Sequence, residues 1–156
     1  MKKLVSAALL AGATSASAAG QFSSLVSYDY VFSKPSTATS HTASMINALV
    51  EYTYPRSLSL YGGFSFILRD SFESALTVGT RLYTPTPMFY WGGSIPIWSY
   101  VGVGAYLVDN TAFYPEAGIR FGVTNNTRLD VFMKVLNSSN NTAYDKHATI
   151  GVGLTF

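Results

Sequence analysis

The chain has 156 residues, of which 48% are hydrophobic, 15% are aromatic and only 12% are charged, and its formal net charge is +2. This length predicts a single domain, and the small net charge argues against a nucleic-acid partner. The absence of cysteine excludes a disulfide framework and a thiolate metal site. No apolar run reaches the roughly 18 residues that a membrane-spanning helix needs. A chain of this kind that crosses a membrane therefore does so as a β-barrel.

The first residues have the pattern of a secretory leader. Lys2 and Lys3 precede an apolar stretch, and the small residues Ala-Ser-Ala follow it at 16–18. A basic region, an apolar region and an A-x-A site in this order are typical of a signal peptide. We therefore predict that residues 1–18 are a signal peptide and that residues 19–156 form the mature domain.

The mature chain consists of short segments in which apolar residues alternate with small or polar ones, and it lacks a sustained helical period. Successive side chains of a strand point to opposite faces, so each segment has one apolar face and one small or polar face. We predict eight strands, at residues 22–32, 43–53, 58–68, 75–83, 98–107, 112–123, 127–136 and 146–156.

The predicted connections differ in kind. Four are polar loops, at 33–42, 69–74, 108–111 and 137–145, and two are tight turns, at 54–57 and 124–126. The connection at 84–97 stands apart because it contains three prolines and the run Met-Phe-Tyr-Trp at 88–91. A ninth strand at 88–95 would put the chain ends on opposite sides of a membrane, whereas eight strands leave both on one side. We therefore interpret this stretch as an interfacial segment or an extension of the fourth strand.

The charged residues within the predicted strands share one face. There are eight of them, and all fall on the small or polar face: Asp29, Glu51, Arg81, Glu116, Arg120, Arg128, Asp130 and Lys134. A charge that faces lipid at mid-depth in a barrel costs about 2–4 kcal/mol, whereas a water-facing sheet surface would accept many more charges than these. The pattern predicts a closed barrel with an ion-pair network of these eight residues inside.

The tight turn at 124–126 indicates which charges face each other. A three-residue turn there places Glu116 opposite Lys134 and Arg120 opposite Asp130. A register shifted by one residue would turn half of these charges toward lipid, so the alternation supports this pairing.

A second row of inward residues is predicted near the end of the barrel that carries the tight turns. The same counting from strand to strand aligns Glu51, Tyr61 and Arg81. An eight-stranded barrel is just wide enough for side chains to fill it. We therefore expect an interior closed by ion pairs and tyrosines, with Tyr61, Tyr83, Tyr100 and Tyr106 among them.

The last predicted strand has an apolar face made of Ala148, Ile150, Val152, Leu154 and Phe156. Together with the leader and the segment Ser-Tyr-Val-Gly-Val-Gly-Ala-Tyr at 99–106, it resembles the small eight-stranded bacterial outer-membrane β-barrel proteins of the OmpA-barrel and OmpX type. The resemblance implies an all-β, antiparallel up-and-down transmembrane barrel. It also implies a monomer surrounded by outer-membrane lipids and lipopolysaccharide. Periplasmic chaperones would carry it in transit, and the barrel-assembly machinery would recognise Phe156 and Leu154.

This resemblance specifies architecture better than function. We expect a non-enzymatic protein without cofactor or metal, with a role in envelope structure or surface interactions. One alternative is a lipid A-modifying enzyme, which needs a histidine, a nucleophile and an acidic group close together. His41 and His147 are the histidines of the chain, and Asp29 is predicted within reach of His147. A surface adhesin and a narrow pore are further alternatives.

Overall fold

The computed structural model describes residues 20–36, 42–55, 57–69, 72–108, 111–138 and 144–156. These residues form nine β-strands: β1 (Gln21–Ser33), β2 (Ser44–Thr53), β3 (Leu58–Leu68), β4 (Phe72–Tyr83), β5 (Phe89–Trp91), β6 (Ile95–Leu107), β7 (Ala112–Gly122), β8 (Arg128–Leu136) and β9 (His147–Thr155). Within this part of the chain no helix is long and apolar enough to cross a membrane. The predicted signal peptide and His41 lie outside the described residues.

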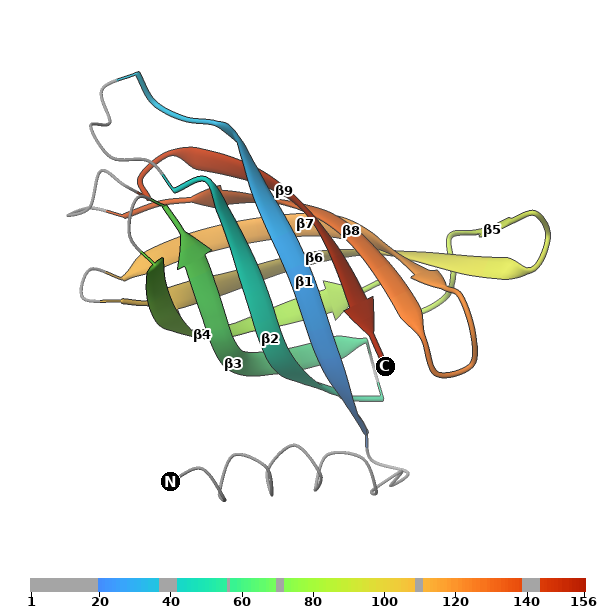
Figure 1. The fold of residues 1–156 in the computed structure, drawn as a ribbon. Helices are drawn as coiled ribbons and strands as arrows, with labels where there is room; N and C mark the ends of the chain where they lie inside the picture. The colour runs from blue at the N-terminus through green and yellow to red at the C-terminus, as the bar shows by residue number, and fades with distance from the viewer. Residues whose placement is uncertain (1–19, 37–41, 56, 70–71, 109–110, 139–143) are drawn as a thin grey trace.

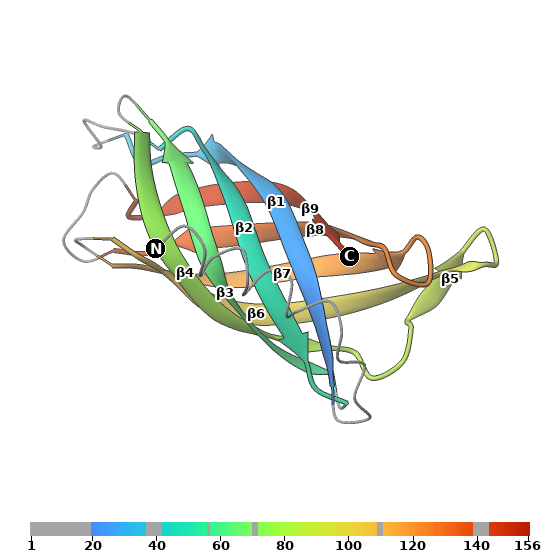
Figure 2. The ribbon, with the colours of Figure 1, turned by 60° about the horizontal axis from the view of Figure 1, so that its bottom comes forward.

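Eight of the strands close into an antiparallel, up-and-down barrel (Figure 1). Each long strand pairs with the next long strand, β1 pairs with β9, and β4 pairs directly with β6. The structure therefore confirms the predicted all-β, eight-stranded barrel. We call the end that carries the connections at 54–57 and 123–127 the turn end (Figure 2). The segment between β4 and β6 also lies at this end. The opposite end, where β1 leads to β2, β3 to β4, β6 to β7 and β8 to β9, is the loop end.

The short strand β5 is not part of the closed ring. It pairs with the first residues of β6, with Phe89 opposite Ile97 and Trp91 opposite Ile95, and it projects beyond the turn end in Figures 1 and 2. The rejection of a strand within 88–95 was therefore wrong. However, β5 continues along the same edge of β6 as β4, after an interruption at 84–88 that contains two prolines. The predicted extension of the fourth strand is close to this arrangement.

Sequence alternation sorts the side chains to the two sides of the barrel wall. Along β9, His147 and Thr149 are fully buried, whereas Ile150 and Val152 keep 44% and 49% of their surface exposed. Seven charged residues within the strands are buried, each with 4% or less of its surface exposed: Asp29, Glu51, Arg81, Glu116, Arg120, Asp130 and Lys134. The wall is thus apolar outside and holds its charges inside.

Four inward aromatic rings lie across directly paired glycines. The pairs are Tyr61–Gly79, Tyr100–Gly118, Tyr114–Gly104 and Phe132–Gly151. A Cβ atom at Gly104 would lie 2.5 Å from the ring of Tyr114, and one at Gly118 would lie 2.7 Å from the ring of Tyr100. Those separations are too short for any side chain. Glycine at these positions therefore lets large rings cross the narrow interior and fill it to native density.

Candidate functional site

The interior near the turn end contains a cluster of five ionised side chains. Arg120 donates to both carboxylate oxygens of Asp130, at 2.6 Å from Nε and 2.8 Å from Nη2, and Nη2 also donates to Glu51 at 2.9 Å. Arg81 donates to Glu116 from Nε at 2.7 Å and from Nη2 at 3.2 Å. The two groups meet where Arg81 Nη1 lies 3.5 Å from Asp130 Oδ2. Each carboxylate faces a guanidinium, which offsets the cost of burying charge.

Tyrosine hydroxyls complete this cluster and extend it toward the loop end. The hydroxyl of Tyr83 donates to Glu51 at 2.7 Å. The hydroxyl of Tyr61 donates to Glu116 at 3.1 Å and lies 3.0 Å from that of Tyr114. Hydrogen bonds of this kind stabilise buried charge in addition to the counter-charge. Among the described residues, Arg81 Nη1 has only the longer ion-pair contact to Asp130 and no hydrogen bond. The cluster is therefore part of a network that crosses the interior.

A second charged pair lies nearer the loop end. Lys134 Nζ donates to Asp29 Oδ2 at 2.7 Å and to the Tyr106 hydroxyl at 3.1 Å. Asn47 Nδ2 donates to the other oxygen of Asp29 at 3.0 Å. The ammonium of Lys134 also lies 4.7 Å from the ring centre of Tyr114, within cation–π distance. This pair is as fully enclosed as the cluster near the turn end.

The ion pairs do not follow the strand register throughout. Strands β7 and β8 pair as predicted, with Glu116 opposite Lys134. Even so, Lys134 binds Asp29 on β1, and Glu116 binds Arg81 on β4. In a narrow closed barrel, side chains from all the strands meet in the interior. Partners across the lumen therefore compete with the partner directly opposite in the ladder.

The predicted alignment of Glu51, Tyr61 and Arg81 in one row was wrong. Glu51 lies opposite Tyr61, but Tyr61 lies opposite Gly79, and Arg81 lies opposite Ser59 in the next row. The register error is two residues along β4, which keeps the same face of the strand. Arg81 therefore still points inward, where its partner is Glu116.

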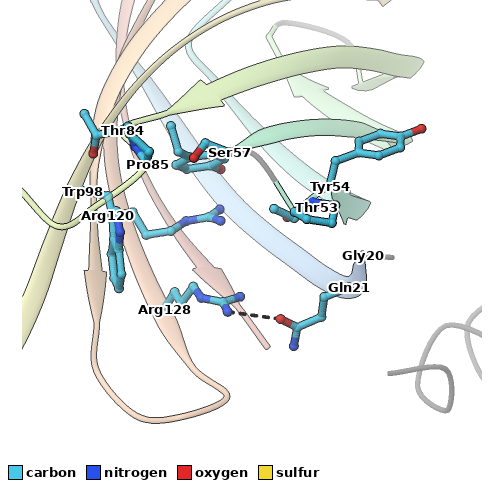
Figure 3. A pocket seen from close by; sticks show the side chains of 12 residues that line it. Gly20, Gln21, Thr53, Tyr54, Ser57, Thr84, Pro85, Trp98, Arg120 and Arg128 are labelled. Carbon is cyan, nitrogen blue, oxygen red and sulfur yellow. Dashed lines mark hydrogen bonds between the residues drawn. The ribbon is translucent and has the colours of Figure 1, made fainter. Parts of the chain in front are cut away.

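At the turn end the interior opens into a vestibule with a volume of about 610 Å³ (Figure 3). Arg120, Arg128 and Trp98 are among the side chains that line it. Arg128 donates to Gln21 at 3.3 Å and is only partly buried. The structure thus places Arg128 at the rim of the barrel, apart from the enclosed ion pairs among which it was predicted.

The loop end is closed by apolar side chains and tyrosines. This plug consists of Met45, Ile67, Ala75, Tyr106, Ala112, Tyr114, Leu136 and Tyr144. The hydroxyl of Tyr144 donates to Glu73 at 2.7 Å, and burial together with this bond raises the pKa of Tyr144 above its usual range. Glu73 is ion-paired with Arg69. It was predicted to lie in a loop but belongs to β4, which begins at Phe72.

The residues considered for an enzymatic site are engaged in structural contacts. His147 is fully buried, and its Nδ1 lies 2.9 Å from the carbonyl oxygen of Asp145. Asp29 lies opposite Gly151, four residues along β9 from His147, and binds Lys134. In the described part of the chain, no group of three His, Cys, Asp or Glu residues could hold a metal ion.

The proposed assembly residues lie on the outside of the barrel. Leu154 and Phe156 keep 48% and 60% of their surface exposed. The backbone of Phe156 exchanges two hydrogen bonds with Ser24, at 2.7 and 2.9 Å, so the ladder between β1 and β9 continues to this residue. Comparison of the chain with protein-family models, with curated proteins and with solved structures finds no match.

Some interior residues were not predicted. Tyr114 and Phe132 were not among the expected inward aromatics, and the apolar plug with Met45, Ile67 and Leu136 was not expected at all. Each has the same strand parity as an inward polar residue of its own strand: a charged residue for Met45, Tyr114, Phe132 and Leu136, and Tyr61 for Ile67. That parity is the signal that could have identified them. These residues are apolar or aromatic, whereas the prediction of inward positions relied mainly on charged residues, so they were not assigned to the interior.

Proposed function

We propose that this protein is an integral bacterial outer-membrane β-barrel with a role in envelope structure or surface interactions, and that it is neither an enzyme nor a pore. The observation that supports this proposal is the apolar outer wall. Val101 and Val103 keep 59% and 58% of their surface exposed, and Phe64 and Leu82 each keep 54%. Contiguous apolar surface around a whole barrel would drive association in water, whereas acyl chains can cover it.

Aromatic side chains at both ends of the wall also support a membrane location. At the turn end, the rings of Phe22 and Tyr52 lie 4.6 Å apart, and those of Tyr52 and Tyr54 lie 4.8 Å apart. At the loop end, Phe66 stacks on Phe72 at 5.6 Å. Aromatic girdles at the two interfaces are typical of outer-membrane barrels. The partners that fit this wall are outer-membrane phospholipids and lipopolysaccharide.

The filled interior favours a structural or surface role over transport. The ion-pair network and the apolar plug occupy successive levels of the barrel, and their side chains are almost completely buried. The vestibule ends at Arg120 and Tyr83, which belong to that network. We expect purified protein in a planar bilayer to give no stable conductance steps. A large, steady conductance would favour the narrow-pore alternative.

A fractionation experiment tests the membrane assignment. The full chain, expressed in a bacterium that has an outer membrane, should sediment with the outer-membrane fraction and resist extraction by carbonate and urea. Its electrophoretic mobility should change on heating, as expected for a barrel that resists detergent until heated. Recovery in the soluble periplasmic fraction without detergent would overturn the proposal.

A deletion strain separates the possible roles. It should be assayed together for detergent sensitivity, surface binding and lipid A composition. A change in detergent sensitivity or binding with an unaltered lipid A profile is the expected result. An altered lipid A profile that His147→Ala reproduces would favour the enzyme instead.

A further inference from the structure

The segment that projects beyond the barrel at the turn end is apolar and aromatic. This aromatic hairpin (residues 88–97) contains β5, a turn at Gly92 and Gly93 with positive φ, and the first residues of β6. Met88, Phe89, Tyr90 and Trp91 keep 55%, 49%, 57% and 64% of their surface exposed. Such exposure of four successive large side chains has a cost in water.

The hairpin is also free of charge. No Asp, Glu, Lys or Arg occurs anywhere between residues 82 and 108. The polar turn at 124–127, at the same end of the barrel, shows what a water-exposed connection of this chain looks like: Thr-Asn-Asn-Thr. Two connections at the same end of the barrel thus differ in composition, one polar and one aromatic. The location at the turn end alone therefore does not explain why the hairpin is apolar.

One face of the hairpin continues the outer wall of the barrel. Phe89 and Trp91 pair with Ile97 and Ile95, which have the same parity on β6 as the exposed Val101. Ile97 itself is buried, with 1% of its surface exposed, so the exposed apolar surface here is that of Phe89 and Trp91. The ring of Trp91 lies 6.3 Å from that of Phe121, which pairs with Ile97 on the other side of β6. Whatever covers the outer wall next to β6 and β7 can therefore cover this face of the hairpin too.

The other features of the hairpin limit how deep it can lie. The outer edge of β5 has no strand partner among the described residues, and Pro85 and Pro87 lie in the interruption between β4 and β5. Pro96 pairs with Tyr90 but has no backbone N–H to donate. Unpaired backbone groups are not tolerated in the hydrocarbon core. Tyr and Trp, in contrast, concentrate at the level of the lipid headgroups, where an apolar ring and a polar tip are both accommodated.

From the geometry we propose that the aromatic hairpin is a membrane-interface anchor, seated among the lipid headgroups of the leaflet nearest the turn end. The proposal rests on the outer-membrane location proposed above and assigns a lipid contact to a segment that is not part of the barrel. Because the hairpin extends the wall on the β6 side alone, it fixes the depth and tilt of the barrel. Lipid is a better occupant than a protein because the apolar face of the hairpin is continuous with the lipid-facing wall.

The two tryptophans of the chain, Trp91 and Trp98, allow a direct test. Trp98 lines the vestibule and is therefore not the residue under test. The substitution Trp98→Phe leaves Trp91 as the single tryptophan reporter. The full chain is refolded into phosphatidylcholine vesicles whose lipids carry bromine either near the headgroup or near the end of the acyl chain. We expect Trp91 fluorescence to be lost mainly with the shallow bromines. Trp91 emission that ignores both lipids and is quenched fully by aqueous iodide would overturn the anchor.

Two further variants serve as controls. One tests whether the quenched emission comes from Trp91, and the other tests whether a reporter elsewhere at the turn end also contacts lipid. Trp91→Phe changes only an exposed side chain, and it should abolish the lipid-quenched part of the emission of the unaltered chain. Asn125→Trp, in a chain that lacks both native tryptophans, places a reporter on the polar turn and should respond to iodide rather than to brominated lipid. Equal lipid quenching at positions 91 and 125 would contradict the proposal.

The experiment also separates this proposal from the outer-membrane assignment. Insertion into the vesicles is read independently, from heat-dependent electrophoretic mobility and resistance to protease. A chain that does not insert refutes the proposed location and the anchor with it. A chain that inserts but shows no lipid quenching of Trp91 refutes the anchor alone. Protection of Trp91 by a second copy, seen as a stable dimer without lipid quenching, would also refute it.

Discussion

The two ends of the barrel interior are closed by different physical means. The loop end is filled by an apolar plug that includes Met45, Ile67 and Leu136, all fully buried. Toward the turn end, the interior is closed by ionised groups, with Arg120 held between Asp130 and Glu51. An apolar plug loses stability roughly in proportion to the volume removed. An ion-pair network instead fails when one member is lost, because its partners remain buried and charged.

The largest effect is expected at the turn end. Arg120→Met should lower the free energy of unfolding by about 3–5 kcal/mol, because it leaves two buried carboxylates without their main counter-charge. Arg128→Met is the matched control: this rim residue has one contact at 3.3 Å, and its loss should cost about 1 kcal/mol or less. Urea unfolding of the protein in vesicles measures both. Equal losses would mean that burial does not distinguish the two arginines.

At the loop end, the expected loss follows volume. Leu136→Ala removes a fully buried side chain from the plug and should lower the free energy of unfolding by about 3 kcal/mol. Met133→Ala, at a position that keeps 52% of its surface exposed on the outer wall, should cost clearly less. The same urea titration compares them, and a larger loss for the Met133 variant would contradict the assignment of inside and outside.

The glycines that face aromatic rings provide a smaller effect. Gly118→Ala places a Cβ 2.7 Å from Tyr100 and should cost about 1–3 kcal/mol through overpacking. Gly62→Ala is the control, because its nearest neighbour would be at an ordinary 3.5 Å. Thermal unfolding monitored by electrophoretic mobility should separate the two variants, and identical midpoints would argue against tight packing at Gly118.

The smallest effect concerns Tyr144, whose hydroxyl donates to Glu73. Tyr144→Phe should cost about 1 kcal/mol at neutral pH. Since the pKa of Tyr144 is raised above its usual value of 10.0, the unfolded chain ionises this group first as the pH rises. The advantage of the unaltered protein should therefore be constant below pH 10 and shrink above it. Urea titrations at several pH values test this, and an advantage that grows with pH would contradict the stated contact.

Much of this architecture follows from the period of two in the sequence. The outward positions of Ile150, Val152 and Leu154 and the inward positions of Asp130 and Lys134 are fixed by parity alone. The register of β7 with β8 follows from the length of their turn. These features are local, because they depend on neighbouring residues or on a single short connection.

The features that could not be predicted depend on how the strands are arranged relative to one another in the closed barrel. Lys134 binds Asp29 on β1 although Glu116 on β7 lies opposite it in the ladder. This contact depends on how three strands meet inside the closed barrel, and the register of two neighbouring strands does not predict it. The short strand β5 forms because β6 extends beyond Tyr83, the last residue of β4, and leaves an edge to pair. That part of β6 pairs on its other edge with β7, with Ile97 opposite Phe121 and Trp98 opposite Arg120.

The central claim, that the apolar face meets lipid and the charged face is enclosed, can be tested along β8. Because the chain has no cysteine, single cysteines can be introduced at Val131, Met133 and Val135 and at Phe132 and Leu136, then spin-labelled in vesicles. Labels at the three odd positions should collide readily with dissolved oxygen and rarely with an aqueous nickel complex, whereas those at the two even positions should meet neither. Ready access of the nickel complex to the odd positions would show that the outer wall faces water and would contradict the account.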